Sequence, residues 1–543
     1  MVLLDGHSLT LDDLHRVAFD RVQVGLSPDA VVRVNAARAV VDAHAARPEP
    51  VYGINTGFGA LAEVAIPADQ LAALQVNLLR SHAAGVDAPL SVPEVRAVMT
   101  LRANVLACGR SGIRLPTLEA LLALLNAGIH PRVPSRGSVG ASGDLAPLAH
   151  LALVLIGEGE VLSNGDGCRS VENSPAEMTS GVFLAPPSKK TPDVISVHEF
   201  STDRHPSPSL PALQAAGLSA VSLGPKEGLA LINGTQASTG VLALAVQRAM
   251  RLSRAADIAA AMSIDALRGS TKPFDARIHD ARPVPGQAAA AANVRALLDG
   301  SAINASHQHC GKVQDAYALR CTPQVHGSAR EAMAFAHRLA TIEANSATDN
   351  PMVFAEEGDI VSGGNFHGAP VALAADTLCI GLAQLATISE RRTDRMMTPH
   401  ESGLPAFLIR DSGLNSGLMM AHVTAAALTA EIKTLAHPAA VDTIPTSAGR
   451  EDHVSMSMGA ALKAARLVEL LTHVLAIEVL AASQALDLLA PLTTSAALQR
   501  AHAAVRGVVP TLIVDRTPAP DIQAIGALIS DGALERACAL QLS

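Results

Sequence analysis

The sequence predicts a mainly α-helical protein, in which a long central helical bundle follows a loop-rich N-terminal part. Of its 543 residues, 49% are hydrophobic and only 17% are charged, so the chain can build a large buried core. From about residue 325 onward, alanine-rich segments recur with apolar residues on most of their faces. Alternation of apolar and polar residues at strand spacing is scarce. Helices that are apolar on most faces must be covered by other helices, which is the arrangement of a bundle.

Two helix starts are marked near the N-terminus. Residues 10–13, TLDD, have the form of a capping box, in which the first side chain binds the backbone of the fourth residue. Residues 27–29, SPD, place a cap residue and a proline before the periodic run 30–46. Both patterns predict helices that begin at these points.

A longer helix is predicted over residues 451–489. Its polar side chains Lys463, Arg466, Glu469 and His473 are three or four residues apart and form one narrow stripe. A helix of this length with so little polar surface belongs inside a bundle.

Residues 164–208 interrupt the helical pattern. They are rich in proline, serine and glycine and show no clear period, which predicts an inserted, partly disordered surface loop; a lid or a contact between subunits is the alternative. We therefore divide the chain into an N-terminal domain over residues 1–208, which contains this insertion, and a helical-bundle domain with C-terminal helices over residues 209–543.

Composition argues against several classes of partner. The formal charge is −9 and no basic tract stands out, so nucleic acid is not expected as a partner. No uncharged apolar run approaches the ~20 residues of a membrane span, and the N-terminus lacks the features of a cleavable secretion signal. Six cysteines are scattered without a CxxC pair, which favours reduced thiols in a cytoplasmic protein.

The run GSVGASGDLAP at residues 137–147 contains the tripeptide Ala141-Ser142-Gly143. Gly143 has no side chain to shield its nitrogen, so a tight bend would bring that nitrogen onto the carbonyl carbon of Ala141. Ring closure with loss of water, followed by loss of the Ser142 hydroxyl, would leave a five-membered ring with an exocyclic methylidene. Such a group is an electrophilic carbon, which no ordinary side chain supplies. Taken alone, the tripeptide also fits a glycine-rich turn before a helix.

Six further blocks accompany this run. They are VYGINTGFG at 51–59, SHAAGV at 81–86, GPKEGLALINGTQAS at 224–238, KVQDAYALRC at 312–321, SGGNFHG at 362–368 and EDHVSM at 451–456. Together the blocks resemble the superfamily of aromatic amino acid ammonia-lyases that carry a 4-methylideneimidazole-5-one (MIO) group, and within it most closely the histidine ammonia-lyases. The resemblance covers nearly the whole chain outside residues 164–208.

This resemblance implies a helical fold of the fumarase/aspartase-like class. It implies an MIO group that forms from Ala141, Ser142 and Gly143 themselves, with no external cofactor. It further implies a homotetramer in which three subunits contribute to each active site. The GSSxMPxKxN loop of the fumarase and aspartase enzymes themselves is not found in this chain.

The resemblance also assigns roles in the release of ammonia. Tyr52 is implied as the general base; an unperturbed phenol has a pKa of about 10, so its pKa must be lowered or alkaline conditions must be favoured. Asn233 is implied to hydrogen-bond the MIO group, and Gln314 and Tyr317 to lie beside it. On the residues alone, Tyr52 also fits a buried tyrosine bonded to backbone, and Asn233 an Asx turn.

Arg320 and Phe366 complete the implied site around the amino acid backbone. Arg320 is implied as the carboxylate clamp, because a planar guanidinium binds a carboxylate through two parallel hydrogen bonds. Gln314 and Tyr317 precede it by six and three residues, so the three side chains can share a face. Phe366 is implied as an aromatic wall near the MIO ring.

Substrate choice is implied to rest on His82 and Glu451. An imidazole ring has one donor and one acceptor, so a pocket for it needs polar partners. Phenylalanine-specific relatives have apolar residues at the first position and glutamine at the second, whereas tyrosine lyases also use histidine at the first. Arg450 stands where glutamine is usual, so a cation next to Glu451 would either hold it ionised or redirect it.

Three other features depart from the family pattern or imitate a different site. Ala316 replaces an expected proline and His326 an expected methionine, and both are compatible with the fold. Residues 307–310, HQHC, look like a metal-ligand cluster but lack distant partners at zinc-site spacing, so no metal is assigned.

The blocks together imply a histidine ammonia-lyase that converts L-histidine to trans-urocanate and ammonia in histidine degradation. A tyrosine ammonia-lyase and an MIO-dependent aminomutase are the alternatives within the enzyme class. An inactive relative that serves as a binding or assembly protein is the alternative of another class, and Tyr52, Ser142 and Arg320 speak against it.

Overall fold

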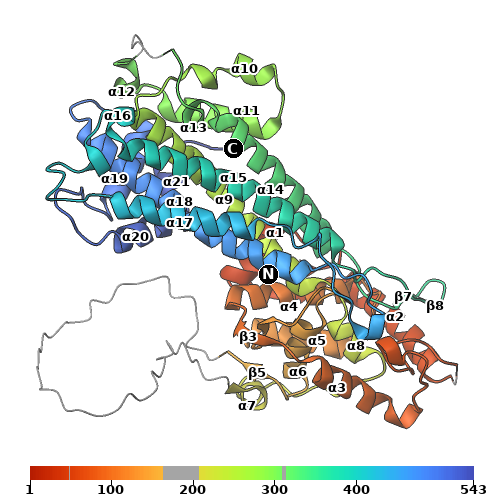
Figure 1. Ribbon diagram of the computed structural model, residues 1–543. Helices are drawn as coiled ribbons and strands as arrows, with labels where there is room; N and C mark the ends of the chain where they lie inside the picture. Colours follow the sequence, from red (N-terminus) through yellow and green to blue (C-terminus); the bar gives the residue numbers. More distant parts are fainter. Residues whose placement is uncertain (48, 163–206, 308–312) are drawn as a thin grey trace, which may run out of the picture.

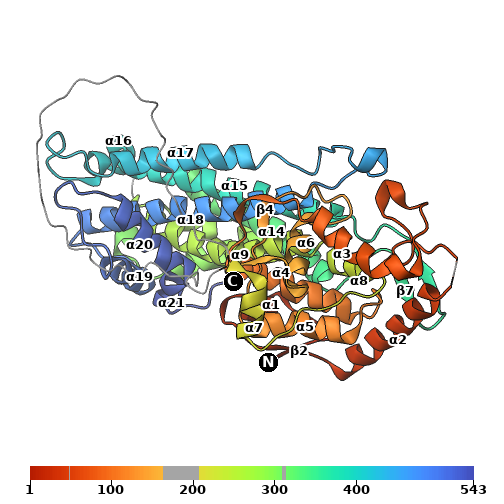
Figure 2. The same cartoon turned by 90° about the horizontal axis from the view of Figure 1, so that it is seen from below.

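The computed structural model describes residues 1–47, 49–162, 207–307 and 313–543, and one elongated helical bundle dominates it. Its long helices run side by side, with the N-terminal elements at one end and the last helices of the chain toward the other (Figure 1 and Figure 2). The bundle helices are α9 (Gln236–Ala266), α14 (Thr322–Ala344), α15 (Ala369–Met397), α17 (Met419–Leu435) and α18 (Ser457–Leu488). The predicted fold class, mainly α with a long central bundle, is confirmed.

The elements before α9 are shorter and are joined by longer loops. They are α1 (Leu11–Phe19), α2 (Pro28–Ala45), η1 (Gly59–Leu61), η2 (Ala68–Gln70), α3 (Leu71–His82), α4 (Val92–Ala107), α5 (Leu115–Asn126), α6 (Leu145–Leu155), α7 (Ser209–Ala215) and α8 (Glu227–Ile232). Among them α4 is buried along nearly its whole length and packs against α9, so it attaches this part of the chain to the bundle.

The remaining helices are short and follow or connect the bundle helices. They are η3 (Lys272–Phe274), α10 (Ala276–Asp280), α11 (Pro285–Leu298), α12 (Ala302–Ala305), α13 (Tyr317–Arg320), α16 (Pro399–Ser402), η4 (Ala406–Leu408), η5 (Ser447–Gly449), α19 (Ala496–Arg506), α20 (Ala519–Ser530) and α21 (Ala533–Cys538). Figure 1 places α10 to α13 at the end of the molecule opposite to α3 and α8.

The strands of the described residues form four two-stranded sheets, and no strand exceeds four residues. One pair is parallel, with Val2 opposite Val24, and the other three are antiparallel. The pairs are β1 (Val2–Leu4) with β2 (Val24–Leu26), β3 (Val86–Pro89) with β4 (Pro134–Arg136), β5 (Glu160–Val161) with β6 (Ser207–Pro208), and β7 (Met352–Phe354) with β8 (Asp359–Val361).

Both predicted helix starts near the N-terminus are confirmed. Thr10 Oγ1 accepts a hydrogen bond from the Asp13 amide at 3.0 Å before α1. Ser27 Oγ accepts one from the Ala30 amide at 3.2 Å before α2. These bonds satisfy backbone donors that the first turn of a helix leaves without partners.

The start predicted at residue 451 for the long helix is wrong, because α18 begins at Ser457. Glu451 instead pairs with Thr446 in an isolated bridge, and Met456 takes a left-handed backbone conformation with φ of 61°. The apolar pattern alone does not reveal a turn that tertiary contacts impose. This turn matters because it frees Glu451 from the helix and directs it to a cavity.

The predicted insertion lies almost wholly outside the described residues. Of the predicted insertion 164–208, only Ser207 and Pro208 fall within the described residues, and they form β6. The core residues on both sides of position 208 belong to one continuous apolar cluster. The division into residues 1–208 and 209–543 therefore stays a prediction.

In the described parts of the chain, one helix, α15, is long and apolar enough to cross a membrane. In its most apolar 18-residue window, 67% of the residues are buried by other helices. Such burial is also what the core helix of a bundle requires.

Charged groups inside the bundle are paired across helices. Arg392 of α15 binds Glu478 of α18 through its Nε at 2.5 Å and its Nη2 at 3.0 Å, and both side chains are fully buried. His326, which stands where methionine was expected, binds Asp257 at 2.7 Å through Nδ1. Asp257 Oδ2 also forms an ion pair with Arg330 Nη2 at 2.5 Å. Because a buried charge is costly unless it is paired, these contacts select one packing of the helices.

We expect Arg392→Met to lower the free energy of unfolding by about 3–5 kcal/mol, because it leaves Glu478 charged and unpaired in the interior. The double variant Arg392→Met/Glu478→Leu should recover most of that loss, since it removes both charges. Thermal melts of the three proteins test this, and equal melting temperatures for the single variant and the wild type would contradict it.

Candidate active site

A cavity of about 320 Å³ lies between the elements before α9 and the loops of the bundle. Its walls are Tyr52, Phe58, Gly59, Leu61, Leu78, His82, Ser142, Leu145, Leu229, Ile232, Asn233, Asn350, Phe366, Ser447 and Glu451. Six of the eleven residues predicted for the site are among these: Tyr52, His82, Ser142, Asn233, Phe366 and Glu451. Ala141 and Gly143 flank Ser142 in the same loop. The fold thus joins positions that are up to 399 residues apart, from Tyr52 to Glu451.

The loop that contains Ser142 is held against the start of α9. Gly143 forms a parallel bridge with Gly234, and the Asp144 amide donates to the Gly234 carbonyl at 2.7 Å. The buried Asp144 carboxylate accepts from the Ser238 amide at 2.7 Å and from the Ser238 hydroxyl at 2.8 Å. Burial raises the pKa of Asp144, and the bonds from Ser238 oppose that rise.

The backbone at Gly143 admits only glycine. Its φ is +75°, and a Cβ there would lie 2.2 Å from the Gly234 carbonyl oxygen. The next helix, α6, begins at Leu145, so the glycine-rich turn before a helix is also present. A tight turn of this kind is what the predicted ring closure needs.

Glu451 faces Ser142 across the cavity. Ser142 Oγ donates to Glu451 Oε1 at 3.0 Å, and Thr446 Oγ1 donates to Glu451 Oε2 at 2.6 Å. Arg450 is exposed, so the carboxylate is oriented by these two hydroxyls. Thr446 was not predicted from the sequence.

His82 is the last residue of α3 and faces the same cavity. Its Nδ1 lies 2.8 Å from the Leu78 carbonyl oxygen, which can only accept, so Nδ1 holds the proton. Burial lowers the pKa of His82, against the opposing effects of this bond and of Glu451, and favours the neutral ring. A neutral ring protonated on Nδ1 presents Nε2 as a hydrogen-bond acceptor.

Tyr52 lies in a turn between α2 and η1, packed edge-on against Phe58 with ring centroids 6.3 Å apart. The Gly59 amide donates to the Tyr52 hydroxyl oxygen at 3.4 Å. Burial raises the pKa of Tyr52, Glu451 raises it further, and the Gly59 amide opposes both. Of the two conditions that the sequence left open for a tyrosine base, this environment favours the alkaline one.

Asn233 lies at the C-terminal end of α8 and is almost fully buried. Its Nδ2 donates to Asp349 Oδ1 at 3.2 Å and to the Asn350 carbonyl at 2.9 Å. Its Oδ1 is buried and has no partner in the described chain. The side chain is therefore held by a specific environment, and an Asx turn alone does not account for it.

Gln314, Tyr317 and Arg320 do not line the cavity. Tyr317 and Arg320 lie on α13, which Figure 1 shows far from α3 and α8. The Tyr317 side chain is 69% exposed, and the Arg320 guanidinium stacks over its ring at 4.6 Å. Gln314 is also exposed. Tyr317 and Arg320 therefore lie together, with the tyrosine side chain outward, whereas a common face with Gln314 stays a prediction.

Several cavity residues lacked a separate signal in the sequence. Phe58 falls within the block at 51–59, but it was assigned no role. Asn350 and Ser447 fall outside all the blocks. Of the HQHC run, only His307 is described, and in the described residues no group of three potential ligands is arranged for a metal ion.

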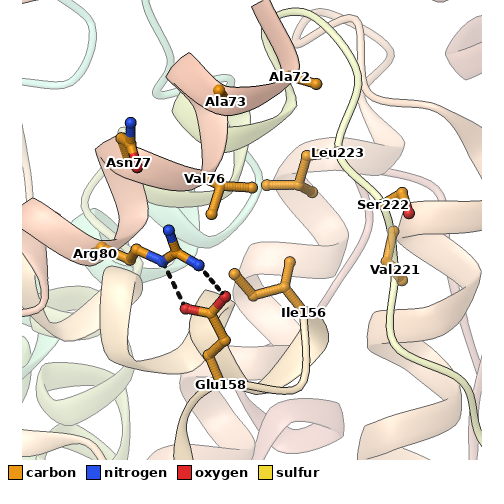
Figure 3. A pocket seen from close by; sticks show the side chains of 10 residues that line it. All are labelled: Ala72, Ala73, Val76, Asn77, Arg80, Ile156, Glu158, Val221, Ser222 and Leu223. Atoms are coloured by element: carbon orange, nitrogen blue, oxygen red, sulfur yellow. Dashed lines mark hydrogen bonds and ion pairs between the residues drawn. The ribbon is translucent and has the colours of Figure 1, made fainter.

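A second hollow of about 410 Å³ lies on the other face of α3 (Figure 3). Ala73, Val76 and Leu223 form its apolar wall, and Arg80 binds Glu158 at its rim at 2.6 Å. None of the predicted site residues lies there. The cavity around Ser142 is therefore the better candidate for a reaction site.

Known proteins resemble this chain over nearly its whole length. The family described as aromatic amino acid lyase matches residues 9–507. The histidine ammonia-lyase of Anaeromyxobacter sp. (strain K) is 54% identical over 98% of this chain and 99% of its own length. The crystal structure of histidine ammonia-lyase from Trypanosoma cruzi is 41% identical, with a TM-score of 0.86 over 99% of this chain and 95% of that one. The tyrosine aminomutase of Streptomyces globisporus is 37% identical, with a TM-score of 0.88 over 100% of both chains.

We expect Gly143→Ala to destabilise the protein more than Gly128→Ala. Both glycines have φ near +70°, at +75° and +72°, but a Cβ at Gly128 meets nothing within 4 Å. In the control, Gly128→Ala, the free energy of unfolding should fall by about 1–2 kcal/mol, which is the cost of a left-handed backbone with a Cβ. In Gly143→Ala it should fall by about 1–3 kcal/mol more, because the Cβ also clashes with backbone. Denaturant unfolding of both variants measures the difference, and equal losses would show that the loop relaxes freely.

Proposed function

Because this chain belongs to the aromatic amino acid lyase family, we propose that it is a histidine ammonia-lyase. Such a carbon–nitrogen lyase releases ammonia from L-histidine and forms trans-urocanate, the first step of histidine degradation, here in the cytoplasm. The observation that supports the substrate most strongly is the position of Glu451 and His82 around one cavity with Ser142.

The loop at residues 141–143 fits the MIO group that enzymes of this family use. Gly143 holds a tight left-handed turn, the Ser142 hydroxyl faces the cavity, and Asn233 keeps a buried oxygen without a partner. Ala141, Ser142 and Gly143 would form the group, and Asn233 would contact it. When formed, MIO supplies an electrophilic carbon, which ordinary side chains lack.

Glu451 would bind the imidazole N–H of the substrate. Formation of the group would remove the Ser142 hydroxyl that donates to Glu451 Oε1, so this oxygen would become free for a substrate donor while Thr446 still holds Oε2. His82 presents a second acceptor, Nε2, to the cavity, which would suit another donor of the substrate such as its ammonium group. A phenyl ring in the same place would leave Glu451 Oε1 without a donor, which costs about 1–3 kcal/mol or more.

Tyr52 would remove the β-proton of the substrate through its phenol oxygen. The base must be a phenolate, and burial disfavours that form. The Gly59 amide stabilises the anion through its hydrogen bond to the hydroxyl oxygen. Alkaline conditions would therefore increase the active fraction.

Gln314, Tyr317 and Arg320 would complete the cavity of a neighbouring subunit. Helix α13, which contains Tyr317 and Arg320, lies at the end of the molecule opposite to the cavity. The planar guanidinium of Arg320 would bind a substrate carboxylate through two parallel hydrogen bonds. We infer a homotetramer in which three subunits contribute to each active site.

A tyrosine ammonia-lyase or an MIO-dependent aminomutase is the second candidate. The similarity to a tyrosine aminomutase over the full chain favours it, and His82 is compatible with a tyrosine substrate. Glu451 favours histidine instead, because its carboxylate can bind the imidazole N–H. An inactive binding protein would not need the assembled cavity.

We expect the purified protein to form urocanate from L-histidine, followed by its absorbance, with little product from tyrosine or phenylalanine. Glu451→Gln should lower kcat/KM for histidine by roughly tenfold or more, because it loses a charge-assisted hydrogen bond. Coumarate from tyrosine, or a β-amino acid by chromatography, would favour the second candidate. No product from any of the three would refute the lyase.

Shared sites predict complementation between two inactive variants. Co-expressed Tyr52→Phe and Arg320→Met chains should recover roughly a quarter of wild-type activity, because some cavities then combine an intact Tyr52 with a neighbour's intact Arg320. Tyr52→Phe with Glu451→Ala is the matched control. Both of these residues line one chain's cavity, so no cavity regains both. Recovery in neither mixture would contradict the shared site.

A further inference from the structure

A buried ion pair lies directly behind Asn233. Lys226 immediately precedes α8 and Asn233 immediately follows it, and Asp349 contacts both of these residues from another segment. Asp349 Oδ2 accepts from Lys226 Nζ at 3.0 Å, and Asp349 Oδ1 accepts from Asn233 Nδ2 at 3.2 Å. Lys226 and Asp349 are at most 1% exposed. One carboxylate therefore links a buried ammonium group to a residue that lines the cavity.

The surroundings of Asn233 permit only one orientation of its amide. Both atoms that contact Nδ2, Asp349 Oδ1 and the Asn350 carbonyl oxygen, can only accept hydrogen bonds. A flipped amide would place Oδ1 against two acceptors with no hydrogen between them. Arg102 further fixes the backbone here, because its Nη1 donates to the Asn233 carbonyl at 2.8 Å.

This orientation leaves one atom of the side chain without a partner. Both amide hydrogens point to the Asp349–Asn350 segment, whereas Oδ1 is buried and unpartnered in the described chain. A buried acceptor without a donor is costly, so its retention beside Ser142 needs an explanation. A role at the reaction centre provides one.

Lys226 holds the second oxygen of the Asp349 carboxylate, because its Nζ donates to Oδ2 at 3.0 Å. Burial lowers the pKa of Lys226, and the nearby Asp349 opposes that change. Without the ammonium group, Asp349 Oδ2 would lose its hydrogen-bond donor, and the carboxylate would be free to turn. Its Oδ1 would then no longer define the orientation of Asn233.

On the basis of the proposed function, we propose that the Lys226–Asp349 pair is a positioning unit for the active site. It holds both amide hydrogens of Asn233 away from the cavity, so that Asn233 presents its oxygen there, as an acceptor for a donor such as the ammonium group of the substrate. Lys226 and Asp349 do not contact the substrate in this arrangement.

The double variant Lys226→Met/Asp349→Leu tests the proposal, because it removes both charges together and avoids leaving one of them buried alone. We expect its melting temperature to fall, because Asp349 also stabilises the charge of the fully buried Arg102, so kcat is measured on protein shown to be folded. We expect kcat for histidine to fall roughly 10²-fold, with a smaller change in KM, as for a misplaced catalytic group. Arg392→Met/Glu478→Leu is the matched control and should keep the wild-type kcat.

Intact mass separates two stages at which the pair would act. A double variant two waters lighter than its sequence has formed the ring, and its low kcat then reports on positioning during turnover. A folded variant that retains these waters shows that the pair positions Asn233 for ring formation. A folded double variant with wild-type kcat and full water loss would overturn the proposal.

A mutant cycle with Asn233→Ala distinguishes positioning from a general structural effect. If the pair acts through Asn233, adding the double variant to Asn233→Ala should not lower kcat further, whereas independent effects would multiply. Asp349→Asn, which keeps the size of the side chain, gives the same comparison if the double variant does not fold. Absence of urocanate from the wild type would instead refute the proposed function itself.

Discussion

The close approach of Gly143 to Gly234 is the contact on which the candidate site depends. Two backbones meet there without any Cβ between them, and the Asp144 amide bonds across the junction. Because of this contact, the loop with Ser142 lies beside Asn233 and at the start of α9. The same contact lets the buried Asp144 reach Ser238, which anchors the loop to the bundle. A side chain at Gly143 would separate these elements, because its Cβ would lie 2.2 Å from the Gly234 carbonyl oxygen.

The length of the bundle determines how the remaining site residues are distributed. α9 has 31 residues and so spans about 46 Å at 1.5 Å per residue. Tyr52, His82 and Glu451 lie near one end of the molecule, whereas Tyr317 and Arg320 lie near the other. A stiff rod of this length cannot bend to bring its ends together. Residues at the two ends can meet only if separate chains pack side by side.

Burial of charge is the second constraint in this structure. Arg392 with Glu478, and Lys226 with Asp349, are ion pairs that water does not reach. The first pair links two helices, while the second lies behind a cavity residue and touches its amide. The same chemistry thus serves packing in one place and orientation in the other. Which role a pair has depends on its neighbours, since a side chain can only orient a group it contacts.

Local sequence signals predicted local structure well. The caps at Thr10 and Ser27 were correct because a capping bond joins residues three positions apart. The start of α18 was misplaced because Met456 and the bridge from Glu451 to Thr446 depend on contacts outside the apolar pattern. Thr446, Asn350 and Asp349 had no sequence signal, since nothing in the chain marks them as neighbours of Glu451 or Asn233.

The sequence by itself determined the helical class, the blocks around Tyr52, Ser142 and Glu451, and the chemistry that those residue types permit. Only the tertiary structure decided which blocks share a cavity and which, like that of Arg320, face outward. It also decided the partners of each polar group: Ser142 and Thr446 for Glu451, and Asp349 for Asn233. The physical reason is the distance along the sequence over which each kind of interaction acts. Caps and helix periods act over a few residues, whereas a site is built from contacts between segments hundreds of residues apart.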